Sequence, residues 1–142
     1  MYQKIVIVGN LGGDPEMRYM PDGTAVTNFS VATNRRWTDQ ASGQPRDETT
    51  WFRVSVWGKQ GESANQYLTR GSKVLVEGRI RPDPATGGPR TFTRQDGTIG
   101  ASFEINADLV RFLSGRDDVG MVSDEGGNYS TAPAQEEDEI PF

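Results

Sequence analysis

Apolar and polar residues alternate in short stretches along the chain, a pattern that predicts β-strands rather than long helices. The predicted strands are residues 4–10, 25–33, 49–58, 73–81 and the second half of a hairpin within 90–112. The pair Asp96-Gly97 is a typical hairpin turn. In the last strand the apolar residues Phe103, Ile105, Ala107 and Leu109 recur at every second position, which indicates one buried face.

The segments between these strands predict loops and one helix. Residues 11–24, 39–48 and 82–89 are rich in Gly, Pro and polar residues, as loops are. Residues 61–71 carry the only helical pattern, with Gly71 as the expected C-terminal cap. The order of three strands, a helix and two strands predicts an all-β fold with one short helix. This order favours a five-stranded Greek-key barrel of the oligonucleotide-binding (OB) type with extended hairpins. An SH3-like barrel is the alternative, but it leaves the helix without a place.

Composition divides the chain into a domain at residues 1–112 and a tail at 113–142. The domain carries 14 Lys and Arg against 12 Asp and Glu, whereas the tail carries one Arg and eight acidic residues. The tail has no helical or strand period and is rich in Gly, Ser and acidic residues, which predicts disorder. It nevertheless ends in four acidic residues followed by Ile140-Pro141-Phe142. Because disordered segments seldom keep large apolar residues, this tip is expected to bind a pocket on another protein.

The chain contains neither Cys nor His. This composition excludes disulfides, the usual zinc sites and Ser-His or Cys-His nucleophiles. A carboxylate-based magnesium site or a glycosidase-like acid pair is still open in principle. The prediction is a protein that is not an enzyme and has no cofactor or metal. With no secretory signal pattern at the N-terminus, an intracellular location is expected.

The predicted strand at 49–58 places two tryptophans on an outer face. Alternation puts Phe52, Val54 and Val56 in the core and Trp51, Arg53, Ser55 and Trp57 on the opposite side. Two exposed tryptophans beside an arginine form an apolar patch that is costly to leave in water. A protein–protein interface also favours Trp and Arg. The other interpretation is a platform on which unpaired bases stack while Arg53 contacts phosphates.

Other aromatic residues also stand beside basic ones, which favours the nucleic-acid interpretation. Trp37 follows Arg35 and Arg36, and Phe92 lies between Arg90 and Arg94 in the last hairpin. Arg79 and Arg81 are predicted on the outer face of the fourth strand. The domain has only a small positive charge and one short helix, whereas duplex-binding proteins usually have a strongly basic surface or a reading helix. Single strands, which expose their base faces, are therefore the expected ligand.

Four segments resemble the bacterial single-stranded DNA-binding protein family. They are VIVGNLGGDPEMRYMPDGTAVTNFSVATN, TTWFRVSVWGK, YLTRGSKVLVEGRI and the terminal DEIPF, so the resemblance covers nearly all of residues 1–112 and the last few residues. It implies an OB-fold domain, usually assembled as a homotetramer, around which single-stranded DNA wraps without sequence specificity. It also implies a non-enzymatic role in DNA replication, recombination and repair, and a cytoplasmic, nucleoid-associated location.

The resemblance also assigns roles to residues. The aromatic residues implied to stack on bases are Trp37, Trp51, Trp57 and Phe92. The basic residues near the implied DNA path are Arg53, Lys59, Arg70, Lys73, Arg79 and Arg81, and the aromatic–basic clusters add Arg35, Arg36, Arg90 and Arg94. The implied partner-binding tip is Asp138, Glu139, Ile140, Pro141 and Phe142, which in the family docks on helicases, primase, nucleases and the clamp loader. The loop at 82–89 is longer than the family's usual connection, which bears on where Phe92 lies.

Three other functions are compatible with parts of this pattern. The first is an oligonucleotide-binding adaptor of the primosomal or RNA-chaperone kind. The second is a protein-interaction module whose tryptophan patch is an oligomer interface. The third is a carboxylate–magnesium nuclease.

Overall fold

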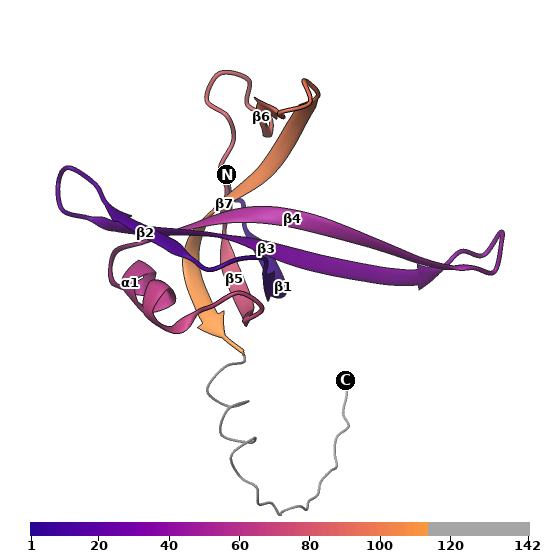
Figure 1. Ribbon diagram of the computed structural model, residues 1–142, viewed down its shortest axis with the longest axis horizontal. Coiled ribbons are helices and arrows are strands. Elements are labelled where there is room, and N and C mark those ends of the chain that lie inside the picture. Colours follow the sequence, from indigo (N-terminus) through magenta and orange to yellow (C-terminus); the bar gives the residue numbers. More distant parts are fainter. Residues whose placement is uncertain (114–142) are drawn as a thin grey trace, which may run out of the picture.

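Five long strands close into a barrel in the computed structural model, which describes residues 1–113 (Figure 1). They are β1 (Ile5–Leu11), β3 (Ala25–Thr38), β4 (Pro45–Trp57), β5 (Lys73–Ile80) and β7 (Ile99–Phe112). The strand order is β1-β5-β7-β4-β3, and β3 returns to β1 at Asn10 and Leu11 to close the barrel. All of these pairs are antiparallel except β4–β7, which is parallel. This arrangement confirms the predicted OB-fold barrel; the tail and its tip lie outside the described residues.

Two short strands extend the barrel into projecting hairpins. β2 (Glu16–Tyr19) forms within the predicted loop at 11–24 and pairs with β3. β6 (Arg90–Thr93) pairs with β7, and Gly97 has φ 88° in the turn between them, as the Asp-Gly pair predicts. β3 and β4 stay paired as far as Thr38 and Pro45, so the predicted loop at 39–48 is shorter than expected. We call residues 33–50 the β3–β4 arm and residues 90–102 the β6–β7 arm; they point in different directions from the barrel (Figure 1).

The helix α1 (Gly58–Tyr67) packs against β3 and β4. It begins three residues earlier than predicted and ends at Tyr67, and the N–H of the capping residue Leu68 donates to the carbonyl of Ala64. The prediction of Gly71 as helix cap is therefore wrong. Gly71 has φ 90° in the turn before β5, a backbone conformation that suits glycine, and its N–H donates to the carbonyl of Leu11. No helix within residues 1–113 is long and apolar enough to cross a membrane.

The core is built from inward side chains of all five long strands and α1. Its fully buried members include Val31, Val54, Val56, Val74, Val76 and Ile105. In β7 the predicted buried face holds for Ile105 and in part for Ala107, but Phe103 is 47% exposed and the alternation fails after Ala107. A β-bulge there pairs Glu77 with Leu109 and Gly78 with Ala107, which leaves Asp108 as the extra residue. Val110, rather than Leu109, is therefore the buried residue beyond the bulge.

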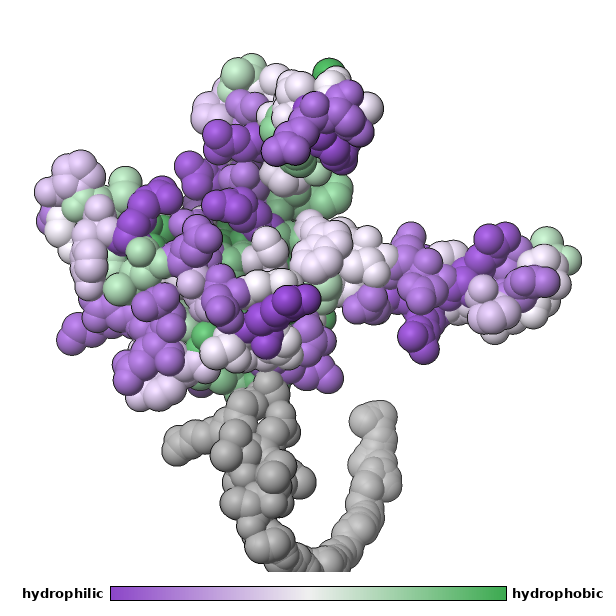
Figure 2. Space-filling model, viewed as in Figure 1, coloured by the Kyte–Doolittle hydropathy of each residue, from purple (hydrophilic) through white to green (hydrophobic). Residues whose placement is uncertain are grey.

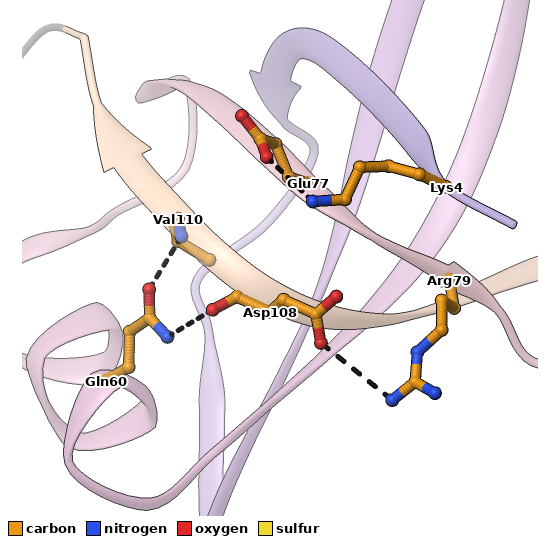
Figure 3. Close-up of polar contacts among 6 residues, drawn as sticks. All are labelled: Lys4, Gln60, Glu77, Arg79, Asp108 and Val110. Carbon is orange, nitrogen blue, oxygen red and sulfur yellow. Dashed lines mark hydrogen bonds and ion pairs between the residues drawn. The ribbon is translucent and has the colours of Figure 1, made fainter. Parts of the chain in front are cut away.

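The bulge is held by the side chain of Gln60 from α1 (Figure 3). Its Nε2 donates to the carbonyl of Asp108 at 3.2 Å, and its Oε1 accepts from the N–H of Val110 at 2.7 Å. One amide thus satisfies two backbone groups that the bulge withdraws from strand pairing. On the outer side, Arg79 approaches the Asp108 carboxylate at 3.9 Å (Figure 3). The bulge therefore determines which residues of β7 lie on the outer surface beside each residue of β5.

Candidate nucleic-acid interface

The outer face of β4 presents the aromatic and basic residues as strand alternation predicts. The side chain of Trp51 is 52% exposed and that of Trp57 is 41% exposed, whereas Val54 and Val56 are buried on the other face. The two tryptophans are six positions apart in sequence, so they lie about 20 Å apart along the strand. Arg53 lies between them, exposed, and is level with Ser30 of β3 and Glu104 of β7. The face can therefore hold an extended chain that runs along β4.

A first hollow, of about 420 Å³, lies on one side of Trp51 and Arg53. Its lining adds the loop after β1, the start of β2 and part of β3, namely Gly12, Gly13, Asp14, Glu16, Asn28, Phe29 and Ser30. The ring of Trp51 rests on Gly12, because a Cβ built at Gly12 would lie 2.5 Å from the ring atom Cζ3. The glycine therefore sets the position of the tryptophan ring. Its place in the site is visible only once β1 and β4 are brought together.

A second hollow, of about 540 Å³, lies on the other side of the same two residues. Trp51 and Arg53 line it together with Phe52 and with Arg90, Phe92, Ala101, Ser102 and Glu104 of the β6–β7 arm and β7. The Phe92 ring is 47% exposed, and the guanidinium of Arg94 lies 5.6 Å from its centre. This is within the range of a cation–π contact. Trp51 and Phe92, forty-one residues apart in sequence, thus line one hollow together with two arginines.

Trp37 lies apart from this pair. It is in the β3–β4 arm, and because Ala32 is level with Trp51, alternation places Trp37 on the opposite face of the ribbon. The guanidinium of Arg35 lies 4.5 Å from the centre of the Trp37 ring. Trp57 lines neither hollow and lies at the other end of β4, immediately before α1.

The arginines of the β3–β4 arm and those of the second hollow differ in whether they form ion pairs. In the β3–β4 arm, Arg35 pairs with Glu48 at 3.2 Å and Arg36 approaches Asp47 at 3.9 Å across the two strands. Hydrophilic residues cover most of this arm (Figure 2). By contrast, Arg53 and Arg90 form no ion pair within residues 1–113. The second hollow therefore holds two arginines whose charges no carboxylate offsets by direct contact.

The remaining predicted phosphate contacts are spread around the barrel. Lys59 is in the first turn of α1 and Lys73 begins β5, and both lie outside the two hollows. Arg70 is in the turn before β5, where its N–H donates to the carboxylate of Asp14, a residue of the first hollow. Arg79 lies near the end of β5, Arg81 comes directly after its last residue, Ile80, and both arginines are exposed.

Several polar residues of the site are missed by sequence pattern alone. Asn28 and Ser30 line the first hollow because β3 pairs with β4 in a register that places them level with Ser55 and Arg53. The hydroxyl of Ser55 donates to Asn28 Oδ1 at 2.6 Å. Alternation from Phe29 and Val31 could have placed them on the outer face, but only the register shows which residues they accompany. Within residues 1–113, no group of three or more acidic side chains is arranged to hold a metal ion.

The turn of the β6–β7 arm depends on Asp96. Its Oδ1 accepts hydrogen bonds from the Thr98 hydroxyl at 2.7 Å and from the Thr98 N–H at 3.0 Å. These two bonds favour the charged carboxylate and hold the pKa of Asp96 below its ordinary value of 3.8. Because the pKa of Asp96 is lower in the folded state than in the unfolded state, the two bonds stabilise the turn fully at pH values above the unfolded-state pKa. This stabilisation is lost as the pH falls through the lowered pKa.

We expect Asp96 to titrate below pH 3.8, since its charged form is the one that the turn binds. Carboxyl carbon chemical shifts followed by NMR between pH 2 and 5 would measure the midpoint. In Thr98→Val, which removes the hydroxyl donor, the midpoint should rise toward 3.8. Identical midpoints in the two proteins would contradict the assigned cause.

The barrel and its open aromatic face define a protein of the oligonucleotide-binding-fold class. The model of the single-strand binding protein family matches residues 2–113, and the chain belongs to this family. A solved deletion mutant of the single-stranded DNA binding protein from Thermus aquaticus is 28% identical, with a TM-score of 0.61. The match covers 81% of this chain and 52% of that one, about half its length. The Plasmodium falciparum SSB, solved as a complex with ssDNA, shares the fold at 23% identity and a TM-score of 0.63, over 80% of this chain and 96% of that one.

Proposed function

We propose that this protein binds single-stranded DNA without sequence specificity and without catalysis. The observation that carries the proposal is the pair of hollows on either side of Trp51 and Arg53, the second of which also holds Phe92 and Arg90. Aromatic rings accept any base face, and stacking is worth about 1–3 kcal/mol per base. Membership of the single-strand binding protein family and the likeness to the single-stranded DNA binding protein from Thermus aquaticus support the same ligand.

The geometry suggests how each residue would act. A base enters the second hollow and stacks on Trp51 or Phe92, while the neighbouring phosphates meet Arg53 and Arg90, whose charges are free of ion pairs within residues 1–113. The first hollow, which Trp51 and Arg53 also line, receives the continuing strand beside the loop at Gly12 and Gly13. Because the base edges point away from most of the aromatic surface, this arrangement favours affinity over base discrimination.

The wrapping of DNA around a homotetramer is part of the proposal. Val6 and Val8, half-exposed on the outer side of β1, support association because apolar strand residues facing solvent are often covered by a partner. A wrapped strand would connect the stacking faces of several subunits. The proposed setting is the bacterial cytoplasm and nucleoid, during replication, recombination and repair.

The proposal is tested by titrating tryptophan fluorescence with a long oligo-thymidine, and with a duplex of the same length as control. We expect strong quenching by the single strand and little by the duplex, since only the single strand offers open base faces to Trp51. Equal quenching by both would contradict a single-strand preference. No quenching by either would mean that the tryptophans face protein, as in an oligomer interface.

The tip at Asp138–Phe142 is proposed to recruit DNA-processing enzymes such as helicases, primase, nucleases and the clamp loader. In this proposal Ile140 and Phe142 fill an apolar pocket, and Glu139 and the terminal carboxylate meet basic residues around it. Deleting Ile140–Phe142 is expected to abolish capture of such an enzyme while changing oligo-thymidine affinity less than twofold. Surface plasmon resonance against one purified partner, alongside the DNA titration, measures both. Loss of both activities together would contradict a separate role for the tip.

A further inference from the structure

A third hollow, of about 520 Å³, lies on the opposite side of β7 from the second one. It is lined by residues of the N-terminus, the end of β5 and β7: Met1, Tyr2, Gln3, Arg79, Ile80, Arg81, Pro82 and Asn106. The two hollows are neighbours, because the N–H of Arg81 donates to the carbonyl of Glu104 at 2.7 Å and Glu104 lines the second hollow. The N-terminus lies at the foot of the β6–β7 arm (Figure 1).

Asn106, a lining residue of this hollow, carries a side-chain acceptor without a donor. Its Oδ1 is buried and has no hydrogen-bond partner within residues 1–113. Strand register places Asn106 level with Ser55 on β4 and Arg79 on β5. Ser55 cannot supply the donor in this arrangement, because its hydroxyl already donates to Asn28. Since buried acceptors almost always find a donor, this atom can accept an N–H or O–H from a bound group.

Tyr2 supplies an aromatic ring to the same hollow. Its side chain is 86% exposed, although it lines the hollow. Residues 1–4 precede β1 and have no strand pairing, so the Tyr2 ring can shift when a ligand enters. Gln3 anchors the segment next to β5, since its Oε1 accepts from the N–H of Ile80 at 2.8 Å.

The positive charge at this hollow comes from β5. Arg81 forms no ion pair within residues 1–113, and Arg79 meets Asp108 only at 3.9 Å (Figure 3). An aromatic ring, a buried acceptor and two arginines in one hollow match the parts of a nucleotide: a base face, a base N–H and a phosphate.

We propose that this hollow is an additional base-binding site, in which Tyr2 stacks on a base, Asn106 Oδ1 accepts an N–H from the base edge, and Arg81 contacts the phosphate. The inference rests on the proposed single-stranded DNA binding and extends its path across β7 from Phe92 to the N-terminus. It also adds a base-edge contact to a surface that otherwise relies on stacking.

Stacking by Tyr2 is tested first with a single-tryptophan reporter. In the background Trp37→Phe, Trp51→Phe and Trp57→Phe, a Tyr2→Trp variant is titrated with oligo-thymidine. A matched reporter carries Tyr67→Trp, at an exposed aromatic position on α1 outside the three hollows. We expect quenching of the first reporter and not of the second. Both proteins must bind a labelled oligo-thymidine by anisotropy, which separates failure of this inference from failure of DNA binding.

Affinity gives the second measurement of Tyr2, in the full chain with its native tryptophans. Tyr2→Ala should weaken oligo-thymidine binding about fivefold or more, the lower end of the stacking range. Tyr2→Phe, which keeps the ring, and Tyr67→Ala should stay within twofold. A Tyr2→Ala affinity within twofold of the original protein, with a silent Tyr2→Trp reporter, would overturn the assignment of Tyr2.

The acceptor is tested with thymidine methylated at N3, which keeps the base face but loses the N–H. Methylation changes every base in the oligonucleotide and so affects all binding sites together. The quantity to compare is therefore the methylation penalty, that is, the fold loss of affinity on methylation, in the original protein and in Asn106→Ala. We expect the penalty to be larger in the original protein by about fivefold, because only that protein loses a hydrogen bond to Oδ1. Equal penalties would overturn the role of Asn106 as the acceptor for a base N–H.

Discussion

Replacing Trp51 with alanine is expected to weaken oligo-thymidine binding by about 5- to 150-fold, the range that corresponds to about 1–3 kcal/mol of lost stacking. The effect should be the largest of any aromatic substitution, because Trp51 is the aromatic residue that lines both the first and the second hollow. Anisotropy of a labelled oligonucleotide gives the dissociation constant directly, without relying on the fluorescence of the tryptophan that has been removed.

Two further variants make this result specific. Trp51→Phe keeps an aromatic face over Gly12 and should recover most of the affinity. Trp57→Ala removes a similarly exposed ring that lines neither hollow, so it should cost less than Trp51→Ala. If Trp51→Ala and Trp57→Ala both leave the affinity within error, the stacking mechanism is wrong.

Replacing Gly78 with alanine is expected to destabilise the domain by about 3 kcal/mol, toward the upper end of what overpacking costs. A Cβ built there would lie 2.1 Å from the carbonyl oxygen of Asn106 and 2.9 Å from the Cα of Ala107. Both atoms are backbone, so the collision can be relieved only by moving β7 at its bulge. Urea unfolding followed by circular dichroism measures the change in unfolding free energy.

Gly88 provides the matched control for this substitution. A Cβ there would meet only the Thr86 hydroxyl oxygen, at 3.7 Å, which is ordinary van der Waals contact. Gly88→Ala should therefore unfold at nearly the same urea concentration as the original protein. Coincident unfolding curves for Gly78→Ala and Gly88→Ala would show that the bulge adjusts freely, contrary to the packing described here.

The barrel could be predicted from the sequence because its strands bury one face, and burial produces the period of two that strand prediction uses. The β3–β4 arm buries no core, so its residues carry no such period. Its strands are instead matched by charge, with Arg35 facing Glu48 and Arg36 facing Asp47. β2 was missed for a related reason: the four residues of Glu16–Tyr19 are mostly exposed and gain their strand conformation by pairing with β3.

The sequence identifies several residues of the site, but it does not predict how they are arranged in space. Trp51 and Arg53 follow from alternation within one strand, whereas their approach to Phe92 depends on the pairing of β7 with β4 and of β6 with β7. The bulge at Asp108 has no sequence signal either. It results from the geometry of barrel closure and from the amide of Gln60, which is supplied by another element.

The cross-strand ion pairs of the β3–β4 arm have a consequence for ionic strength. Binding of a phosphate normally releases condensed counterions, which makes the logarithm of the affinity fall with the logarithm of the salt concentration by about 0.7 per neutralised phosphate of a single strand. A phosphate that reaches Arg35 or Arg36 must instead displace the carboxylate of Glu48 or Asp47. Breaking this ion pair costs free energy, which offsets part of the free energy gained from the phosphate contact. The arm should therefore contribute weakly to affinity in dilute buffer, and the salt response should come mainly from arginines that form no ion pair within residues 1–113, such as Arg53, Arg90 and Arg81.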